Sequence, residues 1–258
     1  MFFVRAHLRK WLAAAVAAAA IPGPAVGCGA MAGQAQIADV DARLDLRLAD
    51  GRSARFAGLD FPSPGAARER LVANGREKPL RIAVLAPRPD RWGRWLVDLA
   101  DSGGASLSDD LLKAGLTRVK PEFETRGCEA ARLAAEAQAR DDGLGLWDDP
   151  DAILDASDVA ALAGAGAGLV VVEGVVRKVG AGRSRFYLDF GGRGGFTVIV
   201  ARRAEAAFRR RGLVLPALAG QTVRVRGYID DRFGPRIEVV DPMMIEPTDN
   251  FGGSRPGG

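Results

Sequence analysis

The chain has 258 residues, of which 48% are hydrophobic and 26% charged, a balance that is typical of a folded globular protein and excludes wholesale disorder. Its formal net charge is +4, and it contains two cysteines and one histidine, His7. Because His7 lies in an N-terminal segment that we expect to be removed, the mature chain excludes Ser-His-Asp and Cys-His mechanisms, and it offers too few ligands for a zinc site.

Residues 1–27 are predicted to be a signal peptide. The basic residues Arg5, Arg9 and Lys10 precede an apolar run at 11–21, which is too short to span a bilayer. We therefore expect an extracytoplasmic protein, in the cell envelope or periplasm of a bacterium.

The sequence AVGC at 25–28 places small residues directly before a cysteine and resembles the lipobox of bacterial lipoproteins. We expect Cys28 to carry a lipid that anchors the protein to a membrane. Ordinary cleavage nearby and a short buried helix are the alternatives. Lipidation would leave Cys128 without a partner, as a small buried helix residue, and the mature chain without an intrachain disulfide.

Charge divides the chain into two parts. Residues 28–167 hold 18 basic and 23 acidic residues, whereas residues 168–247 hold 14 and 8, so the second part is cationic. The stretch AGAGAG at 163–168 lies between them and lacks the lysine of a phosphate-binding loop, which favours a linker. The predicted segments are a signal peptide (1–27), a linker (28–36), a first domain (37–150), a linker (151–167), a second domain (168–248) and a flexible tail (249–258).

The first domain alternates predicted strands and helices. Leu44, Leu46 and Leu48 alternate with charged residues, as in a half-buried strand. The further predicted elements are a strand at 52–60, a helix at 66–74, a strand at 80–86, a turn at Gly93, a helix capped by Ser106 or Ser108 and ended by Gly115, and a helix at 128–141. This pattern predicts a small barrel with helices packed on it.

Four motifs in this domain carry a resemblance to a known family. RFAGLDFP, DRWGRWLVDL, SDDLLKAGLTRV and AAEAQARDDGLGLWDD occur in the order and nearly the spacing of staphylococcal-nuclease-like (thermonuclease) domains, over about residues 37–150. The resemblance implies an OB-type five-stranded barrel. It also implies hydrolysis of nucleic-acid phosphodiesters with one calcium ion, two arginines and a glutamate general base.

The resemblance assigns three residues to the candidate site. Arg55 and Arg94 correspond to the two arginines of the family, which contact phosphate and stabilise the charge of the transition state. Asp60 corresponds to a calcium-ligating aspartate. The alternative is structural, with Arg55 and Asp60 forming an ion pair at the mouth of the barrel.

Two positions depart from the pattern of the family. Ser63 stands where the general-base glutamate is expected, and a serine hydroxyl cannot act as a base at neutral pH; losing the base typically lowers the rate by about 10²- to 10⁴-fold. Leu44 stands where a second acidic ligand is expected. Asp45 faces the other side of the predicted strand, and Asp41 would need a bulge to reach the site. Glu69 could approach from the following helix.

The second domain is predicted to be another OB-type barrel. Three strands at 169–179, 183–191 and 195–203 are followed by a short helix at 204–212 and a hairpin at 221–242, which is the element order of the OB fold. The segment resembles OB modules of the nucleic-acid-binding type. The predicted fold class is therefore β-barrel dominated, with two OB-type barrels in tandem and nuclease-type helices on the first.

Arginines beside aromatic residues in the second domain favour single-stranded nucleic acid as the partner. The candidate contacts are Arg183, Arg185, Tyr187, Arg224 and Arg226. Aromatics in a barrel also serve as core, and outward arginines also form a solvated face, so contact with envelope proteins and support of the first domain remain alternatives.

The sequence thus predicts an exported, lipid-anchored, thermonuclease-like protein that binds nucleic acid, with phosphodiesterase activity weak or lost. One alternative is an active calcium-dependent nuclease that takes its missing carboxylates from elsewhere in the chain. The other is a non-enzymatic envelope lipoprotein that contacts proteins.

Overall fold

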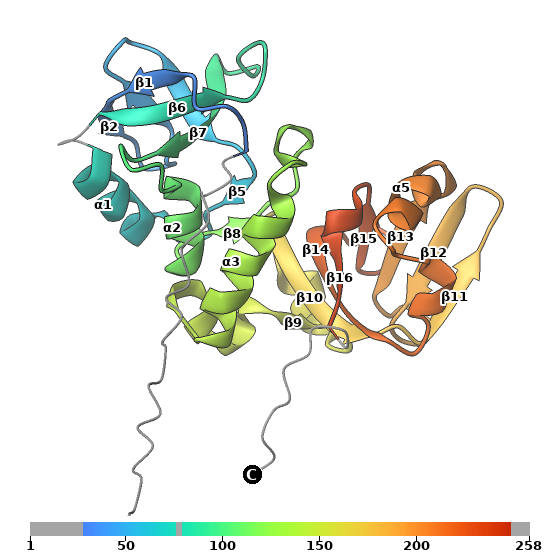
Figure 1. Ribbon diagram of the computed structural model, residues 1–258. Helices are drawn as coiled ribbons and strands as arrows, with labels where there is room; N and C mark the ends of the chain where they lie inside the picture. The colour runs from blue at the N-terminus through green and yellow to red at the C-terminus, as the bar shows by residue number, and fades with distance from the viewer. Residues whose placement is uncertain (1–27, 76–78, 249–258) are drawn as a thin grey trace, which may run out of the picture.

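The computed structural model describes residues 28–75 and 79–248, which form two β-barrel lobes (Figure 1). The predicted signal peptide and tail lie outside the described residues. The first lobe consists of β1 (Gly33–Ala35), β2 (Ile37–Val40), β3 (Leu46–Leu48), β4 (Ser53–Phe56), β5 (Leu59–Asp60), α1 (Pro64–Gly75), β6 (Leu80–Val84), β7 (Arg94–Ala100), α2 (Leu107–Lys113), β8 (Arg118–Val119), the 3₁₀ turn η1 (Phe123–Thr125), α3 (Glu129–Asp141) and the 3₁₀ turns η2 (Gly145–Asp148) and η3 (Pro150–Ala152).

The sheet of the first lobe has the strand order β1-β6-β7-β4-β3-β2. Strands β1 and β2 follow each other directly in the sequence and act as two halves of one bent strand. Because β1 pairs with β6 and β2 pairs with β3, this bent strand closes the sheet into a barrel. Strands β4 and β7 are parallel, and the other neighbours are antiparallel. Apolar residues that alternate along these strands fill the interior, as the half-buried pattern requires.

The second lobe consists of β9 (Leu154–Asp155), α4 (Val159–Gly164), β10 (Leu169–Val175), β11 (Lys178–Ala181), β12 (Arg185–Asp189), β13 (Thr197–Ala201), η4 (Arg202–Ala204), α5 (Glu205–Arg210), η5 (Leu215–Leu218), β14 (Thr222–Asp230), β15 (Arg236–Val239), η6 (Pro242–Met244) and β16 (Ile245–Pro247). The bent strand formed by β10 and β11 pairs at one end with β14 and at the other with β12. Strands β13 and β15 are parallel. The pairing scheme of the first lobe is therefore repeated, and the predicted OB-type, β-dominated fold is observed.

The predicted linkers contain structure. β1 lies within the segment 28–36, and β9 and α4 lie within 151–167. Leu162 and Ala156 are part of the second apolar core, because β9 pairs in parallel with β10 and carries this segment onto the barrel. Periodicity missed these elements because each strand is too short to show an alternation and the helix has fewer than two turns. Within the described residues, no helix has the length and apolar character needed to cross a membrane.

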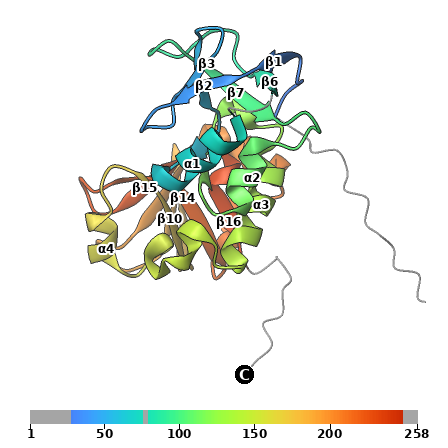
Figure 2. The same cartoon turned by 90° about the vertical axis from the view of Figure 1, so that its left-hand side faces the viewer.

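Helix α3 lies between the first sheet and strands β10 and β14 of the second lobe (Figures 1 and 2). Its Glu136 accepts hydrogen bonds from Arg226 on β14, at 2.8 and 3.0 Å, and both side chains are completely buried. Ala139 and Trp147 pack against Val171 of β10 in a small apolar cluster beside this ion pair. The two lobes therefore share a buried, partly charged interface.

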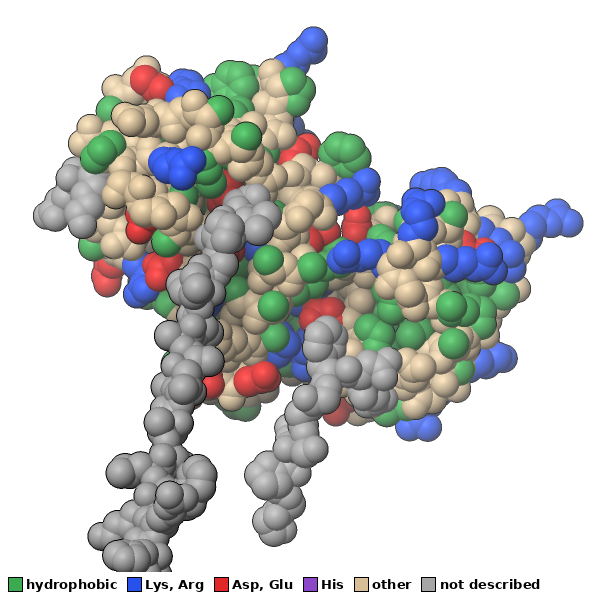
Figure 3. All heavy atoms as spheres, viewed as in Figure 1, with side chains coloured by type: hydrophobic (Ala, Val, Ile, Leu, Met, Phe, Trp, Pro, Cys, Tyr) green, Lys and Arg blue, Asp and Glu red, His purple; other side chains and the backbone are tan. Residues whose placement is uncertain are grey.

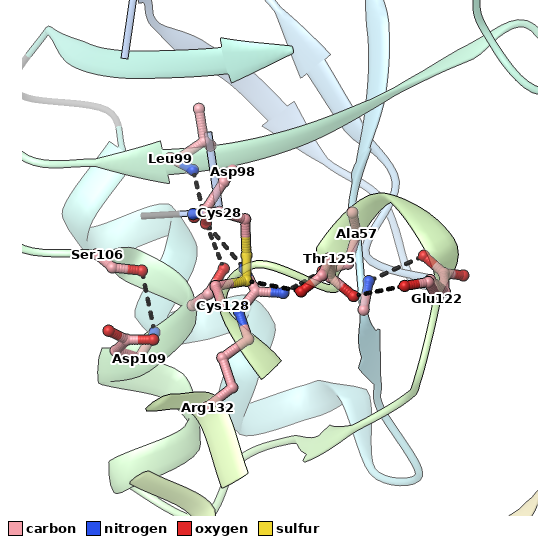
Figure 4. Close-up of a disulfide and its surroundings, with 12 residues drawn as sticks. Cys28, Ala57, Asp98, Leu99, Ser106, Asp109, Glu122, Thr125, Cys128 and Arg132 are labelled. Atoms are coloured by element: carbon pink, nitrogen blue, oxygen red, sulfur yellow. Dashed lines mark hydrogen bonds and ion pairs between the residues drawn. A yellow bond between two sulfur atoms is a disulfide. The ribbon is translucent and has the colours of Figure 1, made fainter. Parts of the chain in front are cut away.

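Cys28 and Cys128 form a disulfide, with Cα atoms 4.9 Å apart (Figure 4). The expectation of an unpaired Cys128 is therefore wrong, and so is the expectation of a lipid on Cys28, because one sulfur cannot hold both a thioether-linked lipid and a disulfide. The sequence could not show this pairing, since the two cysteines are 100 residues apart and only the fold brings them together. The Cys28 N–H also donates to Asp98 at 3.0 Å.

Candidate nucleic-acid site

Arg55 and Arg94 lie on the neighbouring parallel strands β4 and β7, where Ser53 is the Cα partner of Arg94 and Arg55 is that of Leu96. The fold thus brings together two residues that are well separated in the sequence, as the resemblance implied. The turn at Gly93, with φ +77°, directs the chain into β7 and places Arg94 at the start of that strand.

The guanidinium groups of Arg55 and Arg94 both form ion pairs with carboxylates. Arg94 Nη1 donates to Asp45 Oδ1 at 2.7 Å and Arg94 Nη2 to Asp90 Oδ2 at 2.7 Å. Asp90 Oδ2 also lies 3.5 Å from Arg55 Nε. Arg55 then pairs with Glu122, which in turn pairs with Lys120. The site is thus a row of groups with alternating charge, in the order Asp45, Arg94, Asp90, Arg55, Glu122 and Lys120.

The arginines hold Asp90 and Glu122 in their ionised form. Burial alone would raise the pKa of Asp90, but hydrogen bonds from Arg94 and from the backbone outweigh it and lower this pKa to about 2. Burial would likewise raise the pKa of Glu122, yet Arg55, Lys120 and the Gly58 N–H lower it. At neutral pH the two guanidiniums are therefore neutralised by fixed negative charges.

Asp60 lies outside this row. Its Oδ2 accepts from Arg118 Nε at 2.8 Å, so the carboxylate has its own cationic partner. Calcium typically takes about six to eight oxygen ligands. The described residues bring together no group of three acidic, histidine or cysteine side chains that could hold a metal. The residues present therefore do not form the calcium site that the resemblance implied, and we derive no step through a metal.

The two departures from the family pattern lie in different surroundings. Ser63 is exposed, immediately before α1. Leu44 is buried in the core and has φ +63°, because it lies in the turn before β3 rather than in the strand. This turn is held by Asp41, whose Oδ1 accepts from the N–H groups of Arg43 and Asp45 at 2.8 Å. The predicted burial of Leu44, Leu46 and Leu48 is observed, although the strand itself begins only at Leu46. The argument that Asp45 faces away from the site is wrong, because Asp45 accepts from Arg94.

A cavity of about 460 Å³ adjoins Arg94 and Asp45. Trp92 lines it and is 63% exposed. The guanidinium carbons of Arg91 and Arg94 lie 3.9 and 4.8 Å from the centre of the Trp92 ring. A large exposed ring beside cations is suited to stacking with a nucleobase.

The structure corrects the candidate contacts on β14. Arg226 is completely buried at the interface between the lobes, where it pairs with Glu136 and Glu246 and donates to the Val119 carbonyl at 2.9 Å. Arg224 pairs with Glu173 on β10. The Arg226 guanidinium is therefore not available to nucleic acid, and the Arg224 side chain is mostly buried and ion-paired. The reason is tertiary: the outer face of β14, which the sequence pattern predicts to be solvated, packs against α3.

Exposed cations gather at another end of the second lobe. We call this surface the arginine end, and it consists of the exposed residues Arg183, Arg185, Arg202, Arg203, Arg209, Arg210 and Arg211. The turn before β12 joins η4, because the Arg202 N–H donates to the Ser184 carbonyl at 2.9 Å and Arg202 Nε to the Gly182 carbonyl at 3.0 Å. Figure 3 shows the basic side chains gathered on the second lobe around α5.

Tyr187 lies beside the arginine end. It faces outward from β12, two residues after Arg185, and is 38% exposed. A Cβ atom added to Gly182 would lie 3.5 Å from the edge of its ring, so the ring lies close to the glycine of the turn. Tyr187 is thus partly exposed beside the arginine end, and its stacking on a base stays a prediction.

Sequence reasoning did not identify Asp90 and Glu122 as parts of the site. Asp90 stands in the motif DRWGR, where a signal was available: its side chain accepts from the N–H groups of Trp92 and Arg94 at 3.0 Å, a common role of aspartate before a turn. Glu122 is 67 residues from Arg55, and no local pattern predicts that contact.

Comparison with protein families finds one match. Residues 66–149 match the model described as staphylococcal nuclease homologue, a range that runs from within α1 to the end of η2. No curated protein sequence matches the chain.

Proposed function

Because the chain carries a staphylococcal-nuclease-like domain, we propose that it is an exported nucleic-acid-binding protein whose phosphodiesterase activity is weak or lost. The row of alternating charges carries this proposal. Two arginines that would grip a phosphate are already neutralised by Asp45, Asp90 and Glu122, and Ser63 supplies no general base.

The arginine end supplies the affinity for nucleic acid in this proposal. Its arginines have one acidic neighbour within η4 and α5, Glu205, which lies 3.6 Å from Arg209 and 4.0 Å from Arg202. Phe208 of α5 is buried in the core, so the helix presents no large apolar side chain for insertion into a membrane. A surface of arginines beside Tyr187 fits a single strand, whose phosphates and bases need both kinds of contact.

Export is supported by two observations. The sequence begins with the signal-peptide pattern, and the Cys28–Cys128 disulfide requires an oxidising compartment to persist. In this proposal the mature protein is not anchored through Cys28.

Nuclease and binding assays on the same sample of disulfide-bonded residues 28–258 test the function. We expect a fluorescent single-stranded oligonucleotide to bind with an affinity that falls steeply with salt, and cleavage to be at least about 10²-fold slower than by an intact nuclease of the family, with calcium, magnesium or chelator. Fast cleavage that chelator abolishes would instead establish an active metal-dependent nuclease.

Charge-matched variants locate the binding surface. Arg209→Gln with Arg210→Gln should weaken binding and lower the salt slope by roughly 0.7 for each phosphate that is no longer neutralised. Arg81→Gln with Arg88→Gln removes the same charge from exposed positions of the first lobe and should change little. Equal weakening in both double variants would show that net charge, not the arginine end, determines binding, and would favour contact with another anionic surface.

A further inference from the structure

The backbone N–H of Cys28 contacts a buried carboxylate. It donates to Asp98 Oδ2 at 3.0 Å, and the side chain of Asp98, on β7, is 1% exposed (Figure 4). The other oxygen, Oδ1, accepts from Ser108 Oγ at 2.7 Å and lies 3.1 Å from Arg132 Nη2. The disulfide to Cys128 holds Cys28 at this position. A main-chain nitrogen that is 70 residues away in the sequence is therefore fixed against a charged group in the interior of the first lobe.

The surroundings of Asp98 carry more buried negative charge than buried positive charge. The half-buried Asp109 of α2 lies near Asp98 (Figure 4), and burial raises its pKa. Arg132 opposes this rise, repulsion from Asp98 adds to it, and Lys113 opposes it to a smaller extent. Arg132 is 1% exposed, whereas Lys113 lies in solvent. Two carboxylates thus share one buried guanidinium, and a second positive charge beside Asp98 would balance them.

The sequence before Cys28 has the small residues at which export signals are removed. Ala25 and Gly27 stand three residues and one residue before Cys28, after the apolar run at 11–21. A signal peptidase that hydrolyses the bond between Gly27 and Cys28 uses one water molecule and breaks the C–N bond. Gly27 then leaves with the signal as a carboxylate, and the Cys28 nitrogen takes up a proton to become an ammonium. Cleavage at this bond therefore puts a positive charge on the nitrogen that contacts Asp98.

We propose that the mature chain begins at Cys28 and that its α-ammonium forms an ion pair with the buried Asp98 that the precursor cannot form. The amide of the precursor offers Asp98 one N–H, whereas an ammonium offers three donors and a full charge, and hydrogen bonds between ionised groups are the stronger ones. The pair also supports the candidate site, because Asp98 contacts Arg132, which donates to the Ala57 carbonyl at 2.6 Å before the turn at Gly58. Removal of the signal rests on the proposed export, but the ion pair does not depend on nucleic-acid binding.

Mass spectrometry of the exported full chain tests the position of cleavage. After expression of residues 1–258 in a bacterial host, the oxidised mature protein should begin at Cys28 with a free amine. A mature chain that begins at another residue, or that carries a lipid on Cys28, would overturn the proposal. Retention of residues 1–27 would contradict export itself and the ion pair with it.

Two oxidised chains that differ in the place of the amine, residues 28–258 and residues 25–258, test the ion pair. The longer chain keeps the Cys28 N–H but moves the charge away by three residues. Its equilibrium constant for folding, measured by urea unfolding at about pH 6, should be at least about tenfold lower. Asp98→Asn should abolish this difference between the chains. Asp101→Asn removes a charge from an exposed position just after the same strand and should preserve the difference.

The dependence on pH keeps the test decisive if Asp98→Asn does not fold. An α-amine ordinarily has a pKa of about 7.7–8.0, and pairing with Asp98 should raise this pKa in the folded state. The stabilisation is then fully present below about pH 7.7 and lost as pH rises through the raised pKa, so the two chains should converge between about pH 6 and pH 10. The other charged groups around Asp98, which are Asp109, Arg132 and Lys113, are common to both chains and cancel in the comparison.

Three results would overturn the ion pair. They are equal stability of the two chains at about pH 6, a difference that does not change with pH, and a difference that survives Asp98→Asn. Each of them leaves oligonucleotide binding at the arginine end intact, whereas failure of the proposed function removes that binding.

Discussion

Both the backbone conformation and the buried side chain of Leu44 indicate a structural role. Its left-handed φ closes the turn that Asp41 holds, and its side chain is 2% exposed in the core of the first lobe. Ser63, in contrast, is exposed and takes no part in the core. At Leu44 and Ser63 this sequence lacks the carboxylates of the family pattern. Introducing a carboxylate at these two positions should therefore change the free energy of unfolding by different amounts.

Leu44→Asp is expected to destabilise the protein by more than about 3 kcal/mol, because it places an ionisable group in an apolar core without a partner. It should not restore a metal site. Ser63→Glu should leave the free energy of unfolding within about 0.5 kcal/mol of the wild type. Urea unfolding of both variants measures this difference, and a stable Leu44→Asp protein would show that the turn can rearrange toward the site.

At the scale of elements, α3 connects most of the features that position the candidate site. Arg132 is 1% exposed, lies 3.1 Å from Asp98 of β7 and donates to the Ala57 carbonyl that precedes Gly58. Asp98 also accepts from Ser108 of α2 at 2.7 Å. The disulfide ties the start of α3 to Cys28 beside these groups (Figure 4). The helix therefore fixes the turn after β4, whose Gly58 N–H donates to Glu122.

Removing the disulfide should weaken this arrangement. The double variant Cys28→Ser, Cys128→Ser is expected to be less stable by about 2–5 kcal/mol, since the bond closes a loop of 100 residues in the unfolded chain. The oxidised wild type should show no free thiol on titration with a thiol reagent. Two reactive thiols in protein purified from an oxidising compartment would contradict the disulfide and reopen lipidation of Cys28.

At the scale of the whole molecule, the interface between the lobes buries charge. Arg226 and Glu136 are completely buried, and Glu246 and the Val119 carbonyl are further partners of the guanidinium. Burial alone would lower the pKa of Arg226, but Glu136 and Glu246 raise it, so the guanidinium stays charged. Such a pair fixes the orientation of the lobes because neither partner can be left alone in an apolar interface.

Arg226→Met should therefore cost up to about 3–5 kcal/mol, since it removes both guanidinium hydrogen bonds from the buried Glu136 and leaves this carboxylate with only Arg140 and the Val119 N–H. Arg224→Met serves as the control, because its partner Glu173 is more exposed, and it should cost less than about 1 kcal/mol. Chemical denaturation measures both values. A larger destabilisation for Arg224→Met than for Arg226→Met would mean that the buried pair does not hold the lobes together.

Glu129 makes the same interface sensitive to pH. It is 2% exposed, and burial followed by repulsion from Asp241 raises its pKa to about 7 despite attraction from Arg211 and Arg126. The folded state then favours the neutral form. The neutral Glu129 side chain therefore contributes fully to the stability of the fold below the ordinary pKa of 4.5. This contribution is lost as pH rises through about 7.

We expect the stability of the wild type to fall by roughly 1–3 kcal/mol relative to Glu129→Gln between about pH 4.5 and pH 8. Urea unfolding across this range measures the difference. Glu124→Gln, in the same part of the chain, should keep the pH dependence of the wild type. Parallel curves for wild type and Glu129→Gln would show that Glu129 is ionised in the folded protein.

Local patterns predicted a good part of the first lobe. Ser106 caps α2 by accepting from the Asp109 N–H, Gly115 has φ +65° after that helix, and α3 spans Glu129–Asp141, all close to expectation. The resemblance also assigned Arg55 and Arg94 to one site, and the two residues lie on adjacent strands. The partners of these arginines did not follow from the motifs, because Asp45 and Glu122 come from segments 49 and 67 residues away.

The sequence by itself determined the order of most elements and indicated two β-barrels, because turns, caps and alternation act over a few residues. Only the tertiary structure decided which charges are free. Arg226 has the sequence pattern of an outward strand residue and is buried by a helix from the other lobe, whereas the arginines around α5 remain exposed. Charge is fixed by composition, but its availability depends on which surfaces pack together, and that is a property of contacts between residues far apart in the chain.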